Sequence, residues 1–350
     1  QNFRVALGAD RRLPWDVVAT ADLLYTQDVN GLYTTDENLV NQGQSGDGRA
    51  LYGTLRTNTS SSGATSLGVT TARRDTTNLG QAIRIFNKNG GRVANATLQL
   101  QKQIQDILDV SVAYSYTDSK DLISMTSAQA LSNFQFAPVD GTLENRNLRP
   151  SAFDRTHRFT LTATGQLPLG FNAGVIYTGQ SGLPYSWTVN GDVNADGVNN
   201  NDLAFIPADP SQISLQDPGQ YEALNAFIDS QQCLRESKGR IIERGACRNP
   251  WQSFLNVRLG WTSPEFVKGQ RVELQADIFN LLNMFNPKWG LFEQESQFEN
   301  HASAFLRAVG YDAANNRPIY TFTAPTAVRT TVYSPTLSRW RMQIGARYTF

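Results

Sequence analysis

A short segment near the middle of the chain, GDVNADGVNNNDLAFIP, carries the clearest metal-ligand pattern in this sequence. Asp192, Asn194 and Asp196 offer side-chain oxygens at alternate positions. Gly197 follows as the turn residue, and the main-chain carbonyl of Val198 offers the next oxygen. Hard oxygen ligands at this spacing allow a short loop to wrap one calcium ion. The twelfth position holds Leu203 instead of glutamate, so the EF-hand form is not met. The alternative is a turn cluster rich in Asn, Asp and Gly, which needs no metal.

Both cysteines lie in the same polar stretch, with Cys233 and Cys247 on either side of the basic segment LRESKGRIIERGA. An even pair at short spacing is compatible with a disulfide in an oxidising compartment. Two free thiols are the alternative. A bridge that closes about 15 residues contributes roughly 3 kcal/mol in the chain-entropy model and would give a rigid, protease-resistant surface loop.

Enzymatic chemistry has little support in the sequence. The two histidines are His157, at the start of an alternating segment, and His301, in a polar loop. Neither has a metal-ligand partner at HExxH spacing, and the chain has no GxSxG elbow or P-loop. Abundant carboxylates leave a protease or a lipase as an alternative. We expect a protein that is not an enzyme, with calcium as a structural cofactor.

Composition excludes several classes of protein. The chain of 350 residues has 31 basic and 31 acidic residues, so nothing in its charge predicts a nucleic-acid partner. It has no run of about 18 apolar residues, which argues against a transmembrane helix. No signal-peptide pattern opens it, so we expect a mature chain or a piece of a longer one.

Nine segments alternate apolar and polar residues with the period of a β-strand that has two different faces. They are residues 2–10, 15–25, 93–101, 108–117, 158–164, 171–178, 254–261, 271–279 and 341–350. Charged residues in these segments share the polar face, where they would form a ladder against a plug or solvate the wall: Arg158, Arg258, Glu273, Asp277, Arg341 and Arg347. A soluble sandwich would alternate in the same way.

The connections between the segments favour a membrane barrel. Short joints at 11–14, 103–107, 166–170 and 263–270 alternate with long stretches at about 26–93, 118–154, 179–252 and 280–338. Short periplasmic turns and long outer loops alternate in this way in outer-membrane barrels, whereas loops of this length are unusual in compact soluble domains. The sequence therefore predicts an all-β, antiparallel transmembrane β-barrel with about nine membrane strands. Residues 82–86 predict one further strand inside the first long loop.

An odd number of strands would be unusual for a bacterial single-chain barrel. With the short joints in the periplasm, nine strands would leave Gln1 on the outer side. We therefore expect residues 1–350 to be the C-terminal part of a larger barrel. The alternative is that the chain contains a tenth strand, which the alternation of apolar and polar residues does not reveal.

Several motifs resemble TonB-dependent outer-membrane receptors. VELQADIFNLLNMFNP resembles their penultimate strand, and SAFDRTHRFTLTATGQLPLGF and NPWQSFLNVRLGW resemble other barrel segments. FRVALGADRRLPWDVVATADLLYTQDVNGLY is similar to the Oar-type branch. The terminal QIGARYTF resembles the outer-membrane assembly signal, with its residues at Gln343, Gly345, Tyr348 and Phe350.

The resemblance implies a barrel of about 22 strands with a plugged lumen, energised by TonB. The plug, the TonB box and the earlier strands would lie on an N-terminal portion or on a separate chain. By likeness to loops of Oar-type receptors, Asn200 and Asp202 would supply the remaining oxygens to calcium.

The leading hypothesis is therefore the C-terminal part of a transporter in the bacterial outer membrane, with its long loops extracellular and lipid around it. Its substrate stays unknown. The alternatives are a surface adhesion or structural protein whose loops are ordered by calcium, and a passive porin.

Overall fold

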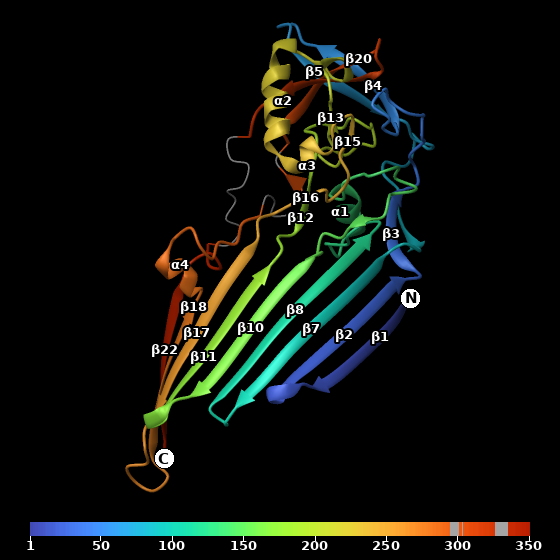
Figure 1. Ribbon diagram of the computed structural model, residues 1–350. Helices are drawn as coiled ribbons and strands as arrows, with labels where there is room; N and C mark the ends of the chain where they lie inside the picture. The colour runs from blue at the N-terminus through green and yellow to red at the C-terminus, as the bar shows by residue number, and fades with distance from the viewer. Residues whose placement is uncertain (295–300, 303, 326–334) are drawn as a thin grey trace.

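The computed structural model describes residues 1–294, 301–302, 304–325 and 335–350. One broad antiparallel sheet forms the lower part of the molecule, and the long connections fold together above it as a loop body (Figure 1). The C-terminus lies at the lower end of the sheet and the N-terminus at its upper end. Strands dominate the chain, so the predicted all-β class is confirmed.

The sheet follows the order of the sequence, β1-β2-β7-β8-β10-β11-β17-β18-β22, and the two-residue strand β9 (Arg149–Pro150) pairs with β8. The long strands are β1 (Asn2–Arg12), β2 (Val17–Asp28), β7 (Arg92–Ile104), β8 (Leu108–Asp121), β10 (His157–Gln166), β11 (Phe171–Gln180), β17 (Gln252–Thr262), β18 (Arg271–Phe279) and β22 (Arg341–Thr349). Each alternating segment of the sequence overlaps one of them. β1 and β22 are the edge strands of this sheet. Among the described residues, β1 pairs only with β2, and β22 pairs only with β18.

Tight turns join the strands at the lower end. Two of them are 3₁₀ turns, η1 (Pro14–Asp16) and η2 (Pro168–Gly170). In η2 the backbone is left-handed, and a Cβ on Gly170 would meet the carbonyl oxygen of Thr262 at 2.1 Å, so this position requires glycine. Trp15, expected at the start of a strand, belongs to η1 instead, because its φ of 62° is incompatible with a strand.

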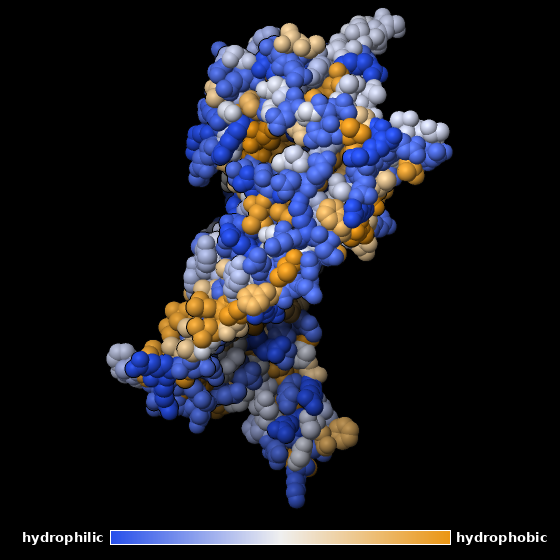
Figure 2. Space-filling model, turned by 90° about the vertical axis from the view of Figure 1, so that its right-hand side faces the viewer, coloured by the Kyte–Doolittle hydropathy of each residue, from blue (hydrophilic) through white to orange (hydrophobic). Residues whose placement is uncertain are grey.

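The strand register places the apolar residues on one face of the sheet and the polar residues on the other. Leu98, for example, lies between Ala21 and Tyr114, and its neighbour Gln99 lies between Thr20 and Ala113. Large apolar side chains on that face are exposed, among them Phe3, Leu7, Leu23, Leu98, Leu259 and Ile344. Figure 2 shows hydrophobic residues gathered across the middle of the molecule, below a largely hydrophilic upper part. A continuous apolar surface of this kind is typical of strands that face lipid.

All four long connections lie at the upper end of the sheet (Figure 1). The first contains β3 (Gly31–Asp36), β4 (Gly53–Thr59), β5 (Thr65–Thr71) and β6 (Ile83–Lys88), and the second contains α1 (Ala130–Gln135) and β9. The third contains β12 (Pro184–Trp187), β13 (Phe205–Ile206), η3 (Pro210–Gln212), β14 (Ser214–Leu215), η4 (Pro218–Gln220), α2 (Tyr221–Ser230), α3 (Gln232–Arg235), β15 (Arg240–Ile241) and β16 (Cys247–Arg248). The fourth contains α4 (Leu281–Phe285), β19 (His301–Ala302), β20 (Leu306–Asp312) and β21 (Arg317–Phe322). The strand predicted within the first connection is confirmed as β6.

The loop body has its own hydrophobic core. Trp187 of β12 is fully buried, with ring centroids 5.7 Å from Phe227 of α2 and 5.4 Å from Phe305. Leu224 and Ile228 stand one helical turn apart on α2 and face the same core. Parallel pairing of β14 with β21 ties the third connection to the fourth. The long connections therefore form one packed body instead of four separate loops.

No helix within the described residues is long and apolar enough to cross a membrane, a finding that concerns helices and not strands.

Candidate functional site

The acidic loop of residues 190–203 is held together by its own side chains. Asp192 accepts hydrogen bonds from the main-chain N–H groups of Asp196 at 3.1 Å and Gly197 at 2.8 Å. Asp196 accepts one from the N–H of Val198 at 2.8 Å. Gly197 has a φ of 86°, a conformation that favours glycine. The spacing seen in the sequence thus produces a chain of tight turns that bring the carboxylates together.

Burial makes these carboxyl groups weaker acids than usual. Asp192 is 6% exposed, and Asp196 and Asp202 are fully buried. Burial, followed by repulsion from Asp196 and Asp202, raises the pKa of Asp192 to about 8. The pKa of Asp202 is raised to about 7, also mainly by burial, and the pKa of Asp196 is raised in the same direction. The loop therefore holds three carboxyl groups that bind protons more readily near neutral pH than exposed carboxyl groups do.

Two buried arginines lie near these carboxyl groups. Arg49 of the first connection donates from Nη1 to Asp202 at 3.3 Å and from Nη2 to the carbonyl oxygen of Leu203 at 2.6 Å. Arg146 of the second connection is 2% exposed, and none of its guanidinium nitrogens has a hydrogen-bond partner among the described residues. The Arg146 charge nevertheless lowers the pKa of Asp196 against the effect of burial. Of these two arginines, only Arg49 hydrogen-bonds to one of the three carboxylates among the described residues.

Asn201 adds an oxygen that the sequence did not single out. This side chain is fully buried, its amide nitrogen donates to Asp196 at 2.9 Å, and its Oδ1 has no hydrogen-bond partner among the described residues. Asn200, which the resemblance favoured, lies at an exposed left-handed turn with a φ of 69°. The run NNN offers three equal candidates, so no signal in the sequence could have distinguished them.

The oxygen atoms of this loop fit a hard cation, but its carboxylates alone are not placed to bind one. Within the part of the chain that the structure describes, no three His, Cys, Asp or Glu side chains are placed to hold a metal. A cation here would therefore need amide and main-chain oxygens besides carboxylates, which is how calcium is usually bound. Asn194, Asn201 and the carbonyl of Val198 are the available donors. The buried, unpaired oxygen of Asn201 is the observation that favours such an ion.

The predicted disulfide between Cys233 and Cys247 is confirmed. It joins α3 to β16 across a sequence separation of 14, and β16 in turn pairs with β12. The bridge therefore fastens the helical part of the third connection to the strand that carries Trp187.

Replacing Cys233 and Cys247 together by serine is expected to lower the stability of the loop body by about 3 kcal/mol, because the open chain gains conformational entropy when it unfolds. Urea-dependent proteolysis of the loop body should show the loss. Reduction of the wild-type protein should give the same shift and should leave the double variant unchanged. An unaltered unfolding midpoint after reduction would contradict the expectation.

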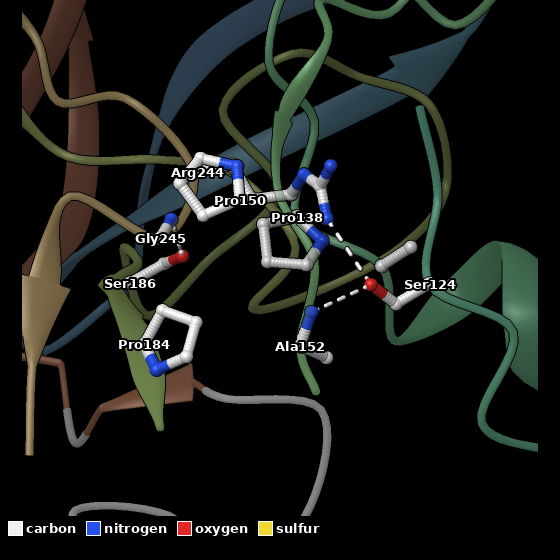
Figure 3. A pocket seen from close by; sticks show the side chains of 9 residues that line it. Ser124, Pro138, Pro150, Ala152, Pro184, Ser186, Arg244 and Gly245 are labelled. Atoms are coloured by element: carbon white, nitrogen blue, oxygen red, sulfur yellow. Dashed lines mark hydrogen bonds between the residues drawn. The ribbon is translucent and has the colours of Figure 1, made fainter. Parts of the chain in front are cut away.

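A small cavity marks the joint between the second and third connections (Figure 3). Its volume of about 20 Å³ accepts one water molecule. Ser124 accepts hydrogen bonds there from the main-chain N–H of Ala152 at 2.9 Å and from Arg244 at 3.3 Å. Arg244 also pairs with Asp121 at 2.7 Å, at the upper end of β8. These contacts anchor the loop body on the sheet, and the cavity is too small for a substrate.

A larger polar cavity of about 260 Å³ lies where the first three connections meet. Its charged lining comprises Arg49, Asp140, Arg149, Asp202, Arg240 and Glu243. Arg149 spans two of the acids, at 2.9 Å from Asp140 and 3.0 Å from Glu243. Because Asp202 also belongs to the acidic loop, a cation in that loop would shape one wall of this cavity.

The polar face of the sheet carries charges of both signs. Arg258 and Asp277 are opposite each other on β17 and β18 and form an ion pair at 2.6 Å. Glu273 and Arg347 are opposite each other on β18 and β22, 4.0 Å apart. The predicted charged set therefore includes two cross-strand pairs, whereas Arg158 is a separate charge on β10.

The remaining residues singled out in the sequence lie on strands or directly after one. His157 begins β10, and its Nδ1 lies 2.8 Å from the hydroxyl of Tyr114. His301 is in β19, and its side chain lies outside the described residues. In the terminal segment, Gln343 and Gly345 are on β22, and the rings of Tyr348 and Phe350 stack 6.0 Å apart. Among the described side chains, the structure gives His157 no metal partner.

Comparison with known proteins identifies the family. A family model described as an outer membrane beta barrel domain matches residues 4–297. Among solved structures, the chain is similar to the outer membrane transporter YddB from Escherichia coli, at 13% sequence identity and a TM-score of 0.39. That similarity covers 99% of this chain and 32% of the transporter, so the chain spans about a third of its length. No curated protein matches the chain.

The family match takes in the strands from β1 to β18 and the long connections between them. It agrees with the exposed apolar face of the sheet and places the protein in the bacterial outer membrane. The chain belongs to the outer membrane beta barrel domain family.

Proposed function

We propose that this chain is the C-terminal part of a TonB-dependent outer-membrane transporter of the Oar type. The observation that carries the proposal is the register of the sheet, which gives a lipid-type outer face, a polar inner face and every long connection at one end. Among the described residues, β1 pairs only with β2 and β22 only with β18, which leaves room for further strands to complete a wide barrel.

In this proposal the chain supplies the wall of the channel and a substrate-collecting surface. Residues such as Thr97, Gln99 and Ser115 give the inner face groups that hydrogen-bond without adding charge, suited to the side of a plug. The ion pair between Arg258 and Asp277 adds charges of both signs, which does not favour an ion-selective ring. TonB would act on a plug in the N-terminal portion, and the loop body would meet the substrate first.

A second function is favoured by the construction of the loop body. Its own core, its disulfide and its acidic loop give it the rigidity of a surface-adhesion module. In that case the barrel only anchors it. A passive porin is a third reading and predicts ion conductance without an energy source.

Mass spectrometry with N-terminal sequencing of everything purified with this chain from outer membranes distinguishes these functions. We expect a plug, a TonB box and about a dozen further strands, either continuous with the chain or on a stoichiometric partner. A folded chain that carries no plug and has no such partner would overturn the transport proposal. A complete barrel without a plug would favour adhesion, or a porin if it conducts ions.

We further propose that the acidic loop binds calcium through oxygens of Asp192, Asn194, Asp196, Val198 and Asn201. The unfolding midpoint of the loop body should be lowest in chelator and should rise with calcium concentration, because the ion binds only the folded loop. Replacing Asp196 by Asn should remove that rise.

The matched control for this test is Glu222→Gln, on the exposed side of α2. This variant should keep the full response to calcium. A wild-type protein whose loop body has the same midpoint in chelator and in calcium would contradict a metal site and would identify the loop as a cluster of turns.

A further inference from the structure

The apolar face of the sheet has a groove near the ends of the strands that carry the long connections. The groove has a volume of about 390 Å³ and crosses β1, β2, β7 and β8. Leu7, Leu23, Tyr25 and Tyr116 surround two small residues, Ala94 and Ala96. The hollow is therefore part of the surface that faces lipid, and almost all of its wall is apolar.

The strand register explains why the surface is hollow at this point. Ala94 pairs with Tyr25 on one side, and Ala96 lies between Leu23 and Tyr116. Two methyl side chains thus stand where the neighbouring strands carry large ones. Because apolar surface in a membrane is covered by acyl chains, this hollow offers a lipid chain more contact than a flat wall would.

A cationic rim lies directly above the groove on the same face. Arg92 comes two residues before Ala94, about 7 Å further along the strand, and pairs with Gln27 and Lys120 on the adjacent strands. Arg92 is exposed, and its side chain has no ion-pair or hydrogen-bond partner among the described residues. The nearby carboxylate of Asp118 pairs instead with Lys120, at 3.3 Å. A free guanidinium above an apolar groove matches a phosphate group above an acyl chain.

We propose that this groove binds a phosphorylated lipid of the outer leaflet, with an acyl chain over Ala94 and Ala96 and a phosphate on Arg92. The inference rests on the proposed function, because Arg92 reaches the outer leaflet only if the long connections are extracellular. It adds a specific lipid contact that the proposed function does not require.

The test is native mass spectrometry of the protein purified from outer membranes in mild detergent, titrated with lipid A or with chemically dephosphorylated lipid A. We expect selective binding of the phosphorylated form. Arg92→Ala should weaken lipid A binding by about tenfold or more, the loss of a charge-assisted hydrogen bond, and should leave the dephosphorylated lipid unaffected. Ala94→Leu with Ala96→Leu should fill the groove and weaken the binding of both lipids.

Two control variants lie on the same face outside the groove. Arg11→Ala removes a cation at the opposite end of β1, and Ala21→Leu adds the same bulk on β2. Both should bind lipid A as the wild type does. Equal binding of the two lipids, or equal effects of Arg92→Ala and Arg11→Ala, would overturn the inference. If instead the protein is not recovered from outer membranes, the proposed function itself fails.

Discussion

Replacing Leu98 by arginine is expected to prevent stable assembly of the sheet in the membrane. Leu98 is 51% exposed on the apolar face, in the middle of β7, with Ala21 and Tyr114 beside it. An arginine on the lipid face at the bilayer midplane costs about 2–4 kcal/mol. Because the folded state is only marginally stable, we expect less protein in the outer-membrane fraction and a lower midpoint of unfolding in lipid bilayers.

The adjacent residue provides the control. Gln99 faces the polar side of the same strand, so Gln99→Arg adds the same charge where water can solvate it. That variant should assemble close to the wild-type level. If both variants lost the same amount of assembled protein, the assignment of one face to lipid and the other to water would be wrong. A greater loss for Gln99→Arg would mean that the polar face is the one in contact with lipid.

The faces of the sheet could be predicted because the signal for them is local. In a strand, successive side chains point to opposite sides, so a segment such as 93–101 reveals its two faces without knowledge of its neighbours. The short turns force β1 to pair with β2, β7 with β8, β10 with β11 and β17 with β18, whereas the pairing across the long connections does not follow from the turns. The loop body has no such rule. Its core joins Trp187 to Phe305 across more than a hundred residues of sequence, and neither residue belongs to a periodic segment.

The acidic loop was predictable only in part for the same reason. The spacing of Asp192, Asn194 and Asp196 reveals turns whose carboxylates converge, and this holds within one short segment. Arg49, which pairs with Asp202, lies 153 residues away in the sequence, and the position of Arg146 depends on a different connection. The charge balance of the loop is therefore a tertiary property, which decides whether a cation is needed.

Replacing Trp187 by alanine is expected to cost the loop body about 3–5 kcal/mol, since it removes the largest buried side chain of the core and leaves a cavity among aromatic rings. Phe227 and Phe305 lose their edge-on contacts with the indole at the same time. Limited proteolysis across a urea series should show the loop body opening while the sheet stays protected, because the aromatic core contains no residue of the long strands.

Trp187→Phe separates packing from polarity at the same position. The indole Nε1 of Trp187 is buried without a hydrogen-bond partner among the described residues, so phenylalanine removes an unsatisfied donor while it keeps a ring in contact with Phe227. Its cost should be less than half that of alanine. If phenylalanine were as damaging as alanine, Nε1 would have to bind a partner that the packing does not reveal, such as a buried water. If instead the loop body of the Trp187→Ala variant stayed resistant to protease, the aromatic core would not be what holds the four connections together.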